Sequence, residues 1–338
     1  MSILGLNSNS SYIYGDTGYS DITVEQINLE DGSMYDLFQE CDDAVHEVFL
    51  AIYEADCIEL QGKANLLLTE GVGISEFEYL LMEADTNEEP ADPNADKESK
   101  AVTIKNRISD FNHKAVSKIK YAVGKIMDAV ISILSSMQTS VEQFSMDVAK
   151  KAKKIYGDGK FKKTPEIKGY DYPIAEDVPD ATELFMHCMT NPLSDTDTDV
   201  SSIVNSAAED ICGFAFTKEG FKELKKALYG SESPITIKFS ESECNNIYNV
   251  LSKGSLRNLV GDLRKQIANC RADYRRLTKD IYDNNISNSH LRLKALNMAK
   301  SGYVKALNML IAAAKGKSAQ GLKVLKIAYG SKSDDGEE

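Results

Sequence analysis

Cysteine and histidine are the most versatile residue types for chemistry in this chain, and their spacing restricts what they can do. The chain has six cysteines and four histidines among 338 residues, and no two cysteines lie closer than 16 positions. This spacing excludes the C-x-x-C pairs of zinc sites and thiol oxidoreductases. The first 15 residues lack a basic start and an apolar core, so no secretory signal is expected there. We therefore predict reduced, mostly buried thiols.

Metal-ligand patterns begin at three places and are incomplete at each. His46 and Glu47 open like the zinc motif H-E-x-x-H, but position 50 is leucine, so the second histidine is missing. His187 and Cys188 are neighbours without further ligands nearby. The alternating aspartates of 195–199 lack the turn glycine and the distal glutamate of a calcium loop. We predict no metal site.

Nucleotide-binding and acyl-transfer motifs are also missing. Gly316, Lys317 and Ser318 match the end of a P-loop, but Ile311 occupies the position where that motif requires its first glycine. No G-x-S-x-G or G-x-G-x-x-G sequence occurs. The sequence therefore predicts a non-enzymatic protein with no catalytic residues, no cofactor and no small-molecule substrate.

The charge of the chain is divided into blocks. The net charge is −13, but residues 1–100 carry −20, residues 101–170 carry +8, residues 171–250 carry −10 and residues 251–338 carry +9. An acidic first third therefore precedes a remainder that is net positive. Such asymmetry is typical of chains in which one part interacts with polyanions or shields another part.

The acidic third divides into two segments. We predict an acidic helical region over 1–83, with a long helix at 33–69, because apolar residues recur there at helical spacing. The segment 84–100 contains Pro90 and Pro93 and no large apolar residue, so it is predicted to be a disordered linker.

A long amphipathic basic helix is predicted over 101–157. Its apolar seam steps by three and four residues through Val116, Ile119, Val123, Ile126, Val130, Ile133 and Met137. Lysines flank this seam at positions 114, 118, 120, 125, 150, 151, 153 and 154. Packing in a bundle is the simpler interpretation. The alternative is an interfacial membrane helix over 111–156, since basic flanks and an apolar face also suit a bilayer surface.

The remainder predicts a mainly helical C-terminal domain at 158–330 and a polar tail at 331–338. Two short stretches, about 164–174 and 234–240, alternate like strands, and Ser240 with Glu243 forms a capping box. The helices expected in this region are 180–190, 198–215, 217–229, 256–281 and 288–328. The fold class is therefore mainly α, a bundle of long amphipathic helices in antiparallel packing with a minor β element. The longest largely apolar run without charge, 129–141, is too short to cross a bilayer.

A basic stripe follows one side of the helix at 256–281. It consists of Arg257, Arg264, Arg271, Arg275 and Lys279, within a region of net charge +12 between 251 and 330. One interpretation is a solvated bundle face. The other is contact with the phosphate backbone of DNA, which would not depend on sequence because no base-reading motif is present.

The order of these parts resembles that of virion proteins of large tailed bacteriophages that are made with an acidic propeptide and enclosed in the head. In such phages a prohead protease cuts after Glu in a Leu/Ile-x-Glu pattern, and here Leu81, Met82 and Glu83 precede Ala84 at the linker boundary. The resemblance implies a structural protein of the capsid interior, made in the host cytoplasm. Its implied partners are other virion proteins, further copies of itself and packaged DNA.

The first prediction concerns this cleavage site. Cutting after Glu83 would remove a strongly acidic piece and leave a product of net positive charge. We expect the protein isolated from mature particles to begin at Ala84, which intact-mass measurement would establish. A mass that still includes residues 1–83 would contradict processing at this site.

Overall fold

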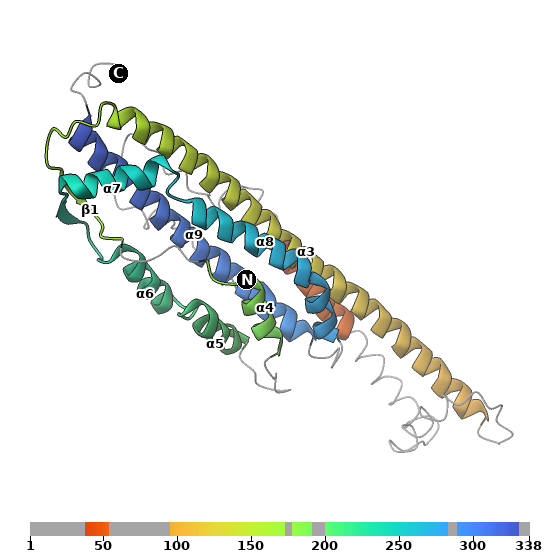
Figure 1. The fold of residues 1–338 in the computed structure, drawn as a ribbon. Helices are drawn as coiled ribbons and strands as arrows, with labels where there is room; N and C mark the ends of the chain where they lie inside the picture. Colours follow the sequence, from red (N-terminus) through yellow and green to blue (C-terminus); the bar gives the residue numbers. More distant parts are fainter. Residues whose placement is uncertain (1–37, 54–94, 173–177, 191–199, 283–288, 331–338) are drawn as a thin grey trace.

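The structure is a computed structural model that describes residues 38–53, 95–172, 178–190, 200–282 and 289–330 (Figure 1). Within these ranges the chain is mainly α-helical, with one small antiparallel sheet packed onto the helices. The predicted fold class is confirmed. The predicted cleavage site at 81–84, the tail at 331–338 and most of the predicted helix at 33–69 lie outside the described residues.

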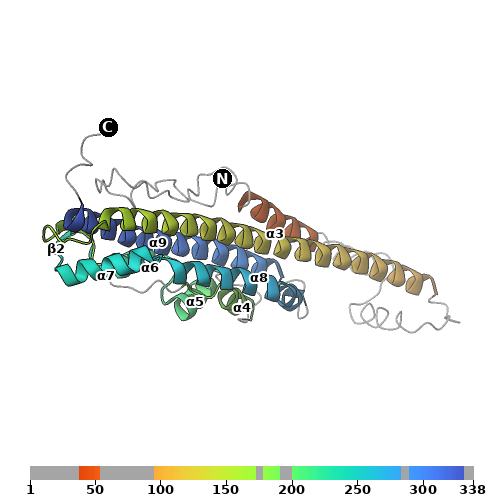
Figure 2. The same ribbon diagram turned by 45° about the horizontal axis from the view of Figure 1, so that its top comes forward.

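The longest helix, α3, runs from Ala95 to Tyr156. Its 62 residues correspond to about 93 Å. It begins within the segment 84–100 that we predicted to be a linker, so residues 95–100 are helical. The reason is local: no proline occurs between Pro93 and Pro165, so nothing in the sequence interrupts a helix that starts at Ala95. The N-terminal end of α3 projects beyond the other helices (Figure 2).

The remaining helices follow the predicted ranges closely. They are α4 (Ala181–Thr190), α5 (Val200–Cys212), α6 (Lys218–Tyr229), α7 (Glu241–Ser252), α8 (Arg257–Tyr282) and α9 (Ser289–Tyr329). The capping box is confirmed at the start of α7, where the Ser240 side chain accepts from the Glu243 backbone and Glu243 accepts from Ser240. Gly254 adopts φ +92° between α7 and α8, a conformation that favours glycine.

The two predicted strands pair with each other. β1 (Glu166–Gly169) and β2 (Ile235–Lys238) are antiparallel, with Ile167 opposite Ile237. Lys238 Nζ lies 3.2 Å from Glu166 Oε2 across the first pair of this register. The ladder closes one end of the bundle, where Ile167 joins apolar residues of α3, α7 and α9 in a second, smaller core.

Helix α9 lies in the middle of the bundle. It contacts α3 and α8, and also α4, α5, α6, α7 and β1, so its apolar residues are buried on most sides. Figure 2 shows α3 on one side of α9 and α4–α6 on the other. Residues of 101–157 and of 158–330 therefore both contribute to the main core.

The long helices α3, α8 and α9 alternate in direction along the chain. Lys315 of α9 contacts Ser140 of α3, and further along both helices Tyr329 packs on Tyr156, so α3 and α9 run parallel. α8 runs opposite to α3, since Arg264 pairs with Glu142 whereas Tyr274 lies at Gly124. The return of the chain along α8 places α9 in the same direction as α3.

Lys300 is a charged residue inside the main core. Its side chain is fully buried, its Nζ has no hydrogen-bond acceptor among the described residues, and the Phe38 ring lies 4.2 Å away. Burial lowers the pKa of Lys300, while the charges of Cys41 and Asp42 oppose that shift. The bundle therefore bears the desolvation cost of a lysine at this position.

We expect Lys300→Met to raise the free energy of unfolding by about 1–2 kcal/mol, because an apolar chain of similar volume replaces a buried cation. The stability difference between Lys300→Met and wild type should shrink as pH rises toward 10.5. Lys300 has a lower pKa in the folded than in the unfolded protein, so the folded wild-type protein loses this proton first and becomes more stable as pH rises. Urea denaturation measures both effects. Lys294→Met, at an exposed site of α9, is the control and should change stability by less than about 0.5 kcal/mol. A loss of stability in Lys300→Met would contradict this account.

Candidate functional site

The predicted seam of α3 lies inside the bundle. Six of its seven residues are buried in the main core, and Val116 is half-buried. Membrane contact through 111–156 would require this apolar face to leave its contacts with α8 and α9. Among the described helices none has both the length and the apolar character needed to cross a bilayer.

Helix α8 presents the predicted basic stripe to solvent. Its apolar residues Leu263, Ile267 and Cys270 face the core, and this orientation turns Arg257, Arg264, Arg271 and Arg275 outward, where all four are exposed. Lys265 and Arg276 are exposed beside them. Lys279 lies in the helix, but its side chain is outside the described set.

The stripe has the dimensions of a short piece of duplex DNA. The 18 steps from Arg257 to Arg275 correspond to about 27 Å of helix, and DNA of that length carries roughly 16 phosphate charges. Arg264 forms an ion pair with Glu142 of α3 at 3.0 Å, with both side chains well exposed. The structure records no ion pair between a described residue and Arg257, Arg271 or Arg275. These three guanidinium groups are therefore available to an external anion.

The backbone of α8 is held firmly beneath the stripe. Asn269 donates to Asp180 at 3.2 Å, and the buried Gln266 accepts from the backbone N–H of Ala181 at 3.0 Å. Asp180 also accepts from the backbone of Thr182 and Glu183, so it caps α4. These contacts fix α8 against α4. Their partners are far apart in sequence, so local sequence patterns do not reveal these contacts.

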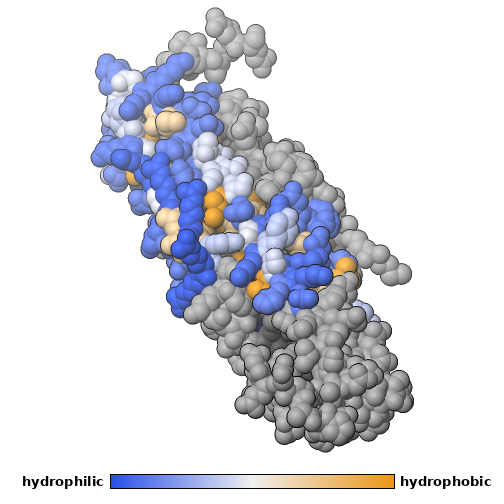
Figure 3. Space-filling model, turned by 90° about the vertical axis from the view of Figure 1, so that its right-hand side faces the viewer, coloured by the Kyte–Doolittle hydropathy of each residue, from blue (hydrophilic) through white to orange (hydrophobic). Residues whose placement is uncertain are grey.

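The lysines of α3 have a different environment from the arginines of α8. Lys118 and Lys125 form ion pairs with Glu47 and Glu40 of the helical segment 38–53, at 3.3 Å and 2.7 Å. Part of the acidic N-terminal region therefore neutralises part of the basic α3. Figure 2 shows this segment and α8 on opposite sides of α3, so the arginine stripe remains uncovered by it. On the face drawn in Figure 3, the described residues are mostly hydrophilic, with small hydrophobic areas.

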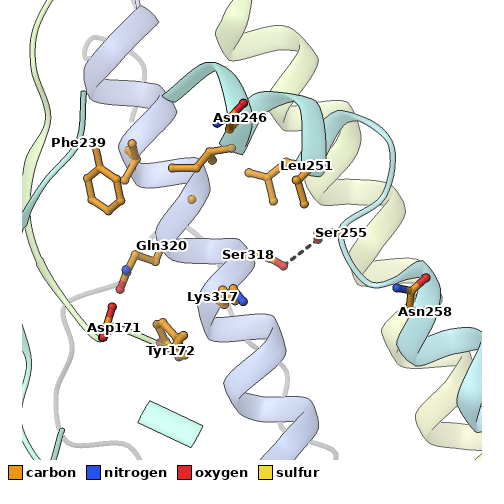
Figure 4. Close-up of a pocket in the computed structure, with 14 residues that line it drawn as sticks. Asp171, Tyr172, Phe239, Asn246, Leu251, Ser255, Asn258, Lys317, Ser318 and Gln320 are labelled. Carbon is orange, nitrogen blue, oxygen red and sulfur yellow. Dashed lines mark hydrogen bonds between the residues drawn. The ribbon is translucent and has the colours of Figure 1, made fainter. Parts of the chain in front are cut away.

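A cavity of about 560 Å³ lies between α7, α9 and the end of the sheet (Figure 4). Its walls are largely apolar, and its polar members include Asp171, Asn258, Lys317 and the hydrogen-bonded pair Ser255 and Ser318, whose oxygens are 2.8 Å apart. No histidine or cysteine lines it, so neither serine has a histidine base beside it. Lys317 and Ser318 lie within helix α9, a geometry unlike the phosphate loop that their sequence imitates.

Metal ligands do not gather in the part of the chain that the structure describes. His187 faces Asp210 at 3.4 Å, and its neighbour Cys188 is buried. All five described cysteines are free thiols, and only Cys212 is not fully buried. Burial raises the pKa of Cys188, Cys212 and Cys270 to about 12.

No protein-family model matches this chain, and comparisons with curated proteins and with solved structures return no match either.

The raised thiol pKa values predict inert cysteines in the folded protein. In a Cys57→Ser background, Cys188, Cys212 and Cys270 should react with a thiol reagent at pH 8 about 10³-fold more slowly than a free cysteine. The reason is that so little of each thiol is present as thiolate at this pH. Cys57 is replaced because it lies outside the described residues. Adding denaturant should restore rapid reaction. Fast labelling of Cys188, Cys212 or Cys270 in the native protein would contradict the buried positions.

Proposed function

We propose that this chain is a non-enzymatic structural protein of a bacteriophage virion, located inside the head and contacting packaged DNA without sequence preference. The observation that carries the proposal is the exposed arginine stripe of α8 on a rigid bundle. Such a stripe suits a polyanion because guanidinium groups bind phosphate oxygens in bidentate fashion.

The type of contact follows from what the stripe contains. Phosphate contacts position a protein on DNA but carry no sequence information. The exposed groups that we assign to DNA contact are Arg257, Arg271 and Arg275. Arg264 is left out because it forms an ion pair with Glu142. Binding of this kind should be weak, with a dissociation constant of about 10⁻⁴–10⁻⁶ M at physiological salt, and strongly salt-dependent.

The acidic first third has a role in the same proposal. Its negative charge limits association with nucleic acid while the protein assembles with other virion proteins or with further copies of itself. Processing after Glu83 then breaks the covalent link between the acidic third and the basic remainder. The ion pairs of Glu40 and Glu47 with α3 lysines support an intramolecular shielding role.

The test compares two triple variants of equal charge change in the full-length protein. Replacing Arg257, Arg271 and Arg275 with Gln should weaken binding to a random 30-base-pair duplex and reduce the slope of log K against log salt by roughly 2.7, which corresponds to three lost phosphate contacts. Fluorescence anisotropy over a salt series measures both quantities.

The matched control replaces Lys218, Lys222 and Lys226 of α6 with Gln. All three are exposed, and they lie on a helix apart from the stripe. Binding of the control should stay close to wild type. Equal weakening in both variants would show that only net charge matters, and the absence of wild-type binding at low salt would reject the proposed DNA contact.

A further inference from the structure

The helical segment 38–53 packs on the bundle through an apolar face. Its buried residues are Cys41, Ala44, Val48, Ala51 and Ile52, and all five belong to the main core that contains α3 and α9. They recur every three or four residues with one adjacent pair, so they form one face of the helix. The segment therefore occupies a groove as an amphipathic helix does.

Polar contacts set the register of this helix in the groove. Glu40 pairs with Lys125 and Glu47 with Lys118, so the segment runs antiparallel to α3. On the other side, Asn297 of α9 donates to Asp42. The Cys41 thiol also contacts the backbone carbonyl of Lys125 at 3.5 Å. The groove thus contacts both edges of the helix as well as its apolar face.

The groove contains a buried lysine that this occupant covers. Lys300 of α9 lies beneath the segment, fully buried, with the Phe38 ring over its Nζ and with Asp42 and Cys41 acting on its charge. Without the segment, the Lys300 ammonium would lose Asp42, the acidic group that acts on its charge, and would share the groove with Lys118 and Lys125. A groove of that character selects an amphipathic helix with an acidic polar face, which is what residues 38–53 supply.

The chain between helix 38–53 and α3 makes none of the contacts named above. Forty-one residues, 54–94, separate the segment from α3, and Glu83 lies among them. Every contact named above joins the segment directly to α3 or α9. We infer that the groove between α3 and α9 binds the helix 38–53 as a separable ligand, so a cut between the two leaves the acidic helix in place. The inference concerns this groove alone and does not depend on DNA contact at α8.

The apolar face supplies the main part of this binding. The two ion pairs are between side chains that are 33–55% exposed, and such pairs contribute little and are screened by salt. The five core residues are at most 6% exposed. Retention of the helix after a cut should therefore persist at high salt.

The experiment cuts the full-length protein at a protease recognition sequence inserted between Glu83 and Ala84. The two pieces are then passed through a gel-filtration column at about 0.15 M and about 1 M NaCl, where screening differs strongly. We expect the fragment 1–83 to elute with the rest of the chain at both salt concentrations, with more than nine-tenths retained. Separation of the pieces at either concentration overturns the inference.

Two variants test whether the apolar face is responsible. Val48→Asp places a charge in the core and should release the fragment after the cut, whereas Phe49→Asp, at a neighbouring position that is 46% exposed, should retain it. Circular dichroism before the cut verifies that both variants are folded. Equal retention in the two variants would contradict the assignment of Val48 to the face that binds the groove. Loss of DNA binding in either uncut variant would count against the proposed DNA contact and not against this inference.

Discussion

The burial of α9 on most of its sides is the constraint on which the rest of this structure depends. A helix with one apolar face needs one neighbour, but α9 carries apolar residues around most of its circumference, as the run Met309, Leu310 and Ile311 illustrates. Such a helix is stable in water only when other elements surround it. The other helices and the small sheet form that covering, and their outward faces provide the surfaces available for function.

The polar groups of α9 give this core a specific arrangement. Gln320 accepts from the backbone N–H of Tyr170 and donates to its carbonyl, at 2.9 Å and 2.8 Å. Tyr303 donates to the carbonyl of Pro179 at 3.0 Å, and Lys315 donates to Ser140 at 2.8 Å. Each hydrogen bond joins one residue of α9 to one residue elsewhere in the chain. Buried polar groups are stable only with a hydrogen-bond partner, so these bonds set the position of α9 along its axis. Apolar packing alone would tolerate sliding of α9 along its neighbours.

Sequence patterns predicted the elements well and their spatial relations poorly. The seam of α3, the heptad-like steps of α8 and the capping box at Ser240 are local signals, because each depends on residues within a few turns. The parallel direction of α3 and α9 and the docking of 38–53 depend on contacts between distant residues. The burial of Lys300 was also missed, since lysine normally indicates a solvent-facing position. Four exposed lysines, at 294, 305, 323 and 326, fall on one narrow side of α9, and the position of Lys300 off that side is the signal that could have revealed it. For the candidate site, the arginine side of α8 was predictable from spacing, whereas its support by Asp180 and Gln266 was not.

The central position of α9 has a consequence for the order of events during synthesis. Asp42 and its partner Asn297 are 255 positions apart, so the N-terminal helix is made long before its groove exists. At roughly 5–20 residues per second, the ribosome needs about 13–50 s to cover that interval. During this time the apolar faces of α3 and α8 also lack their central partner. The main core therefore cannot be completed until α9 has been synthesised.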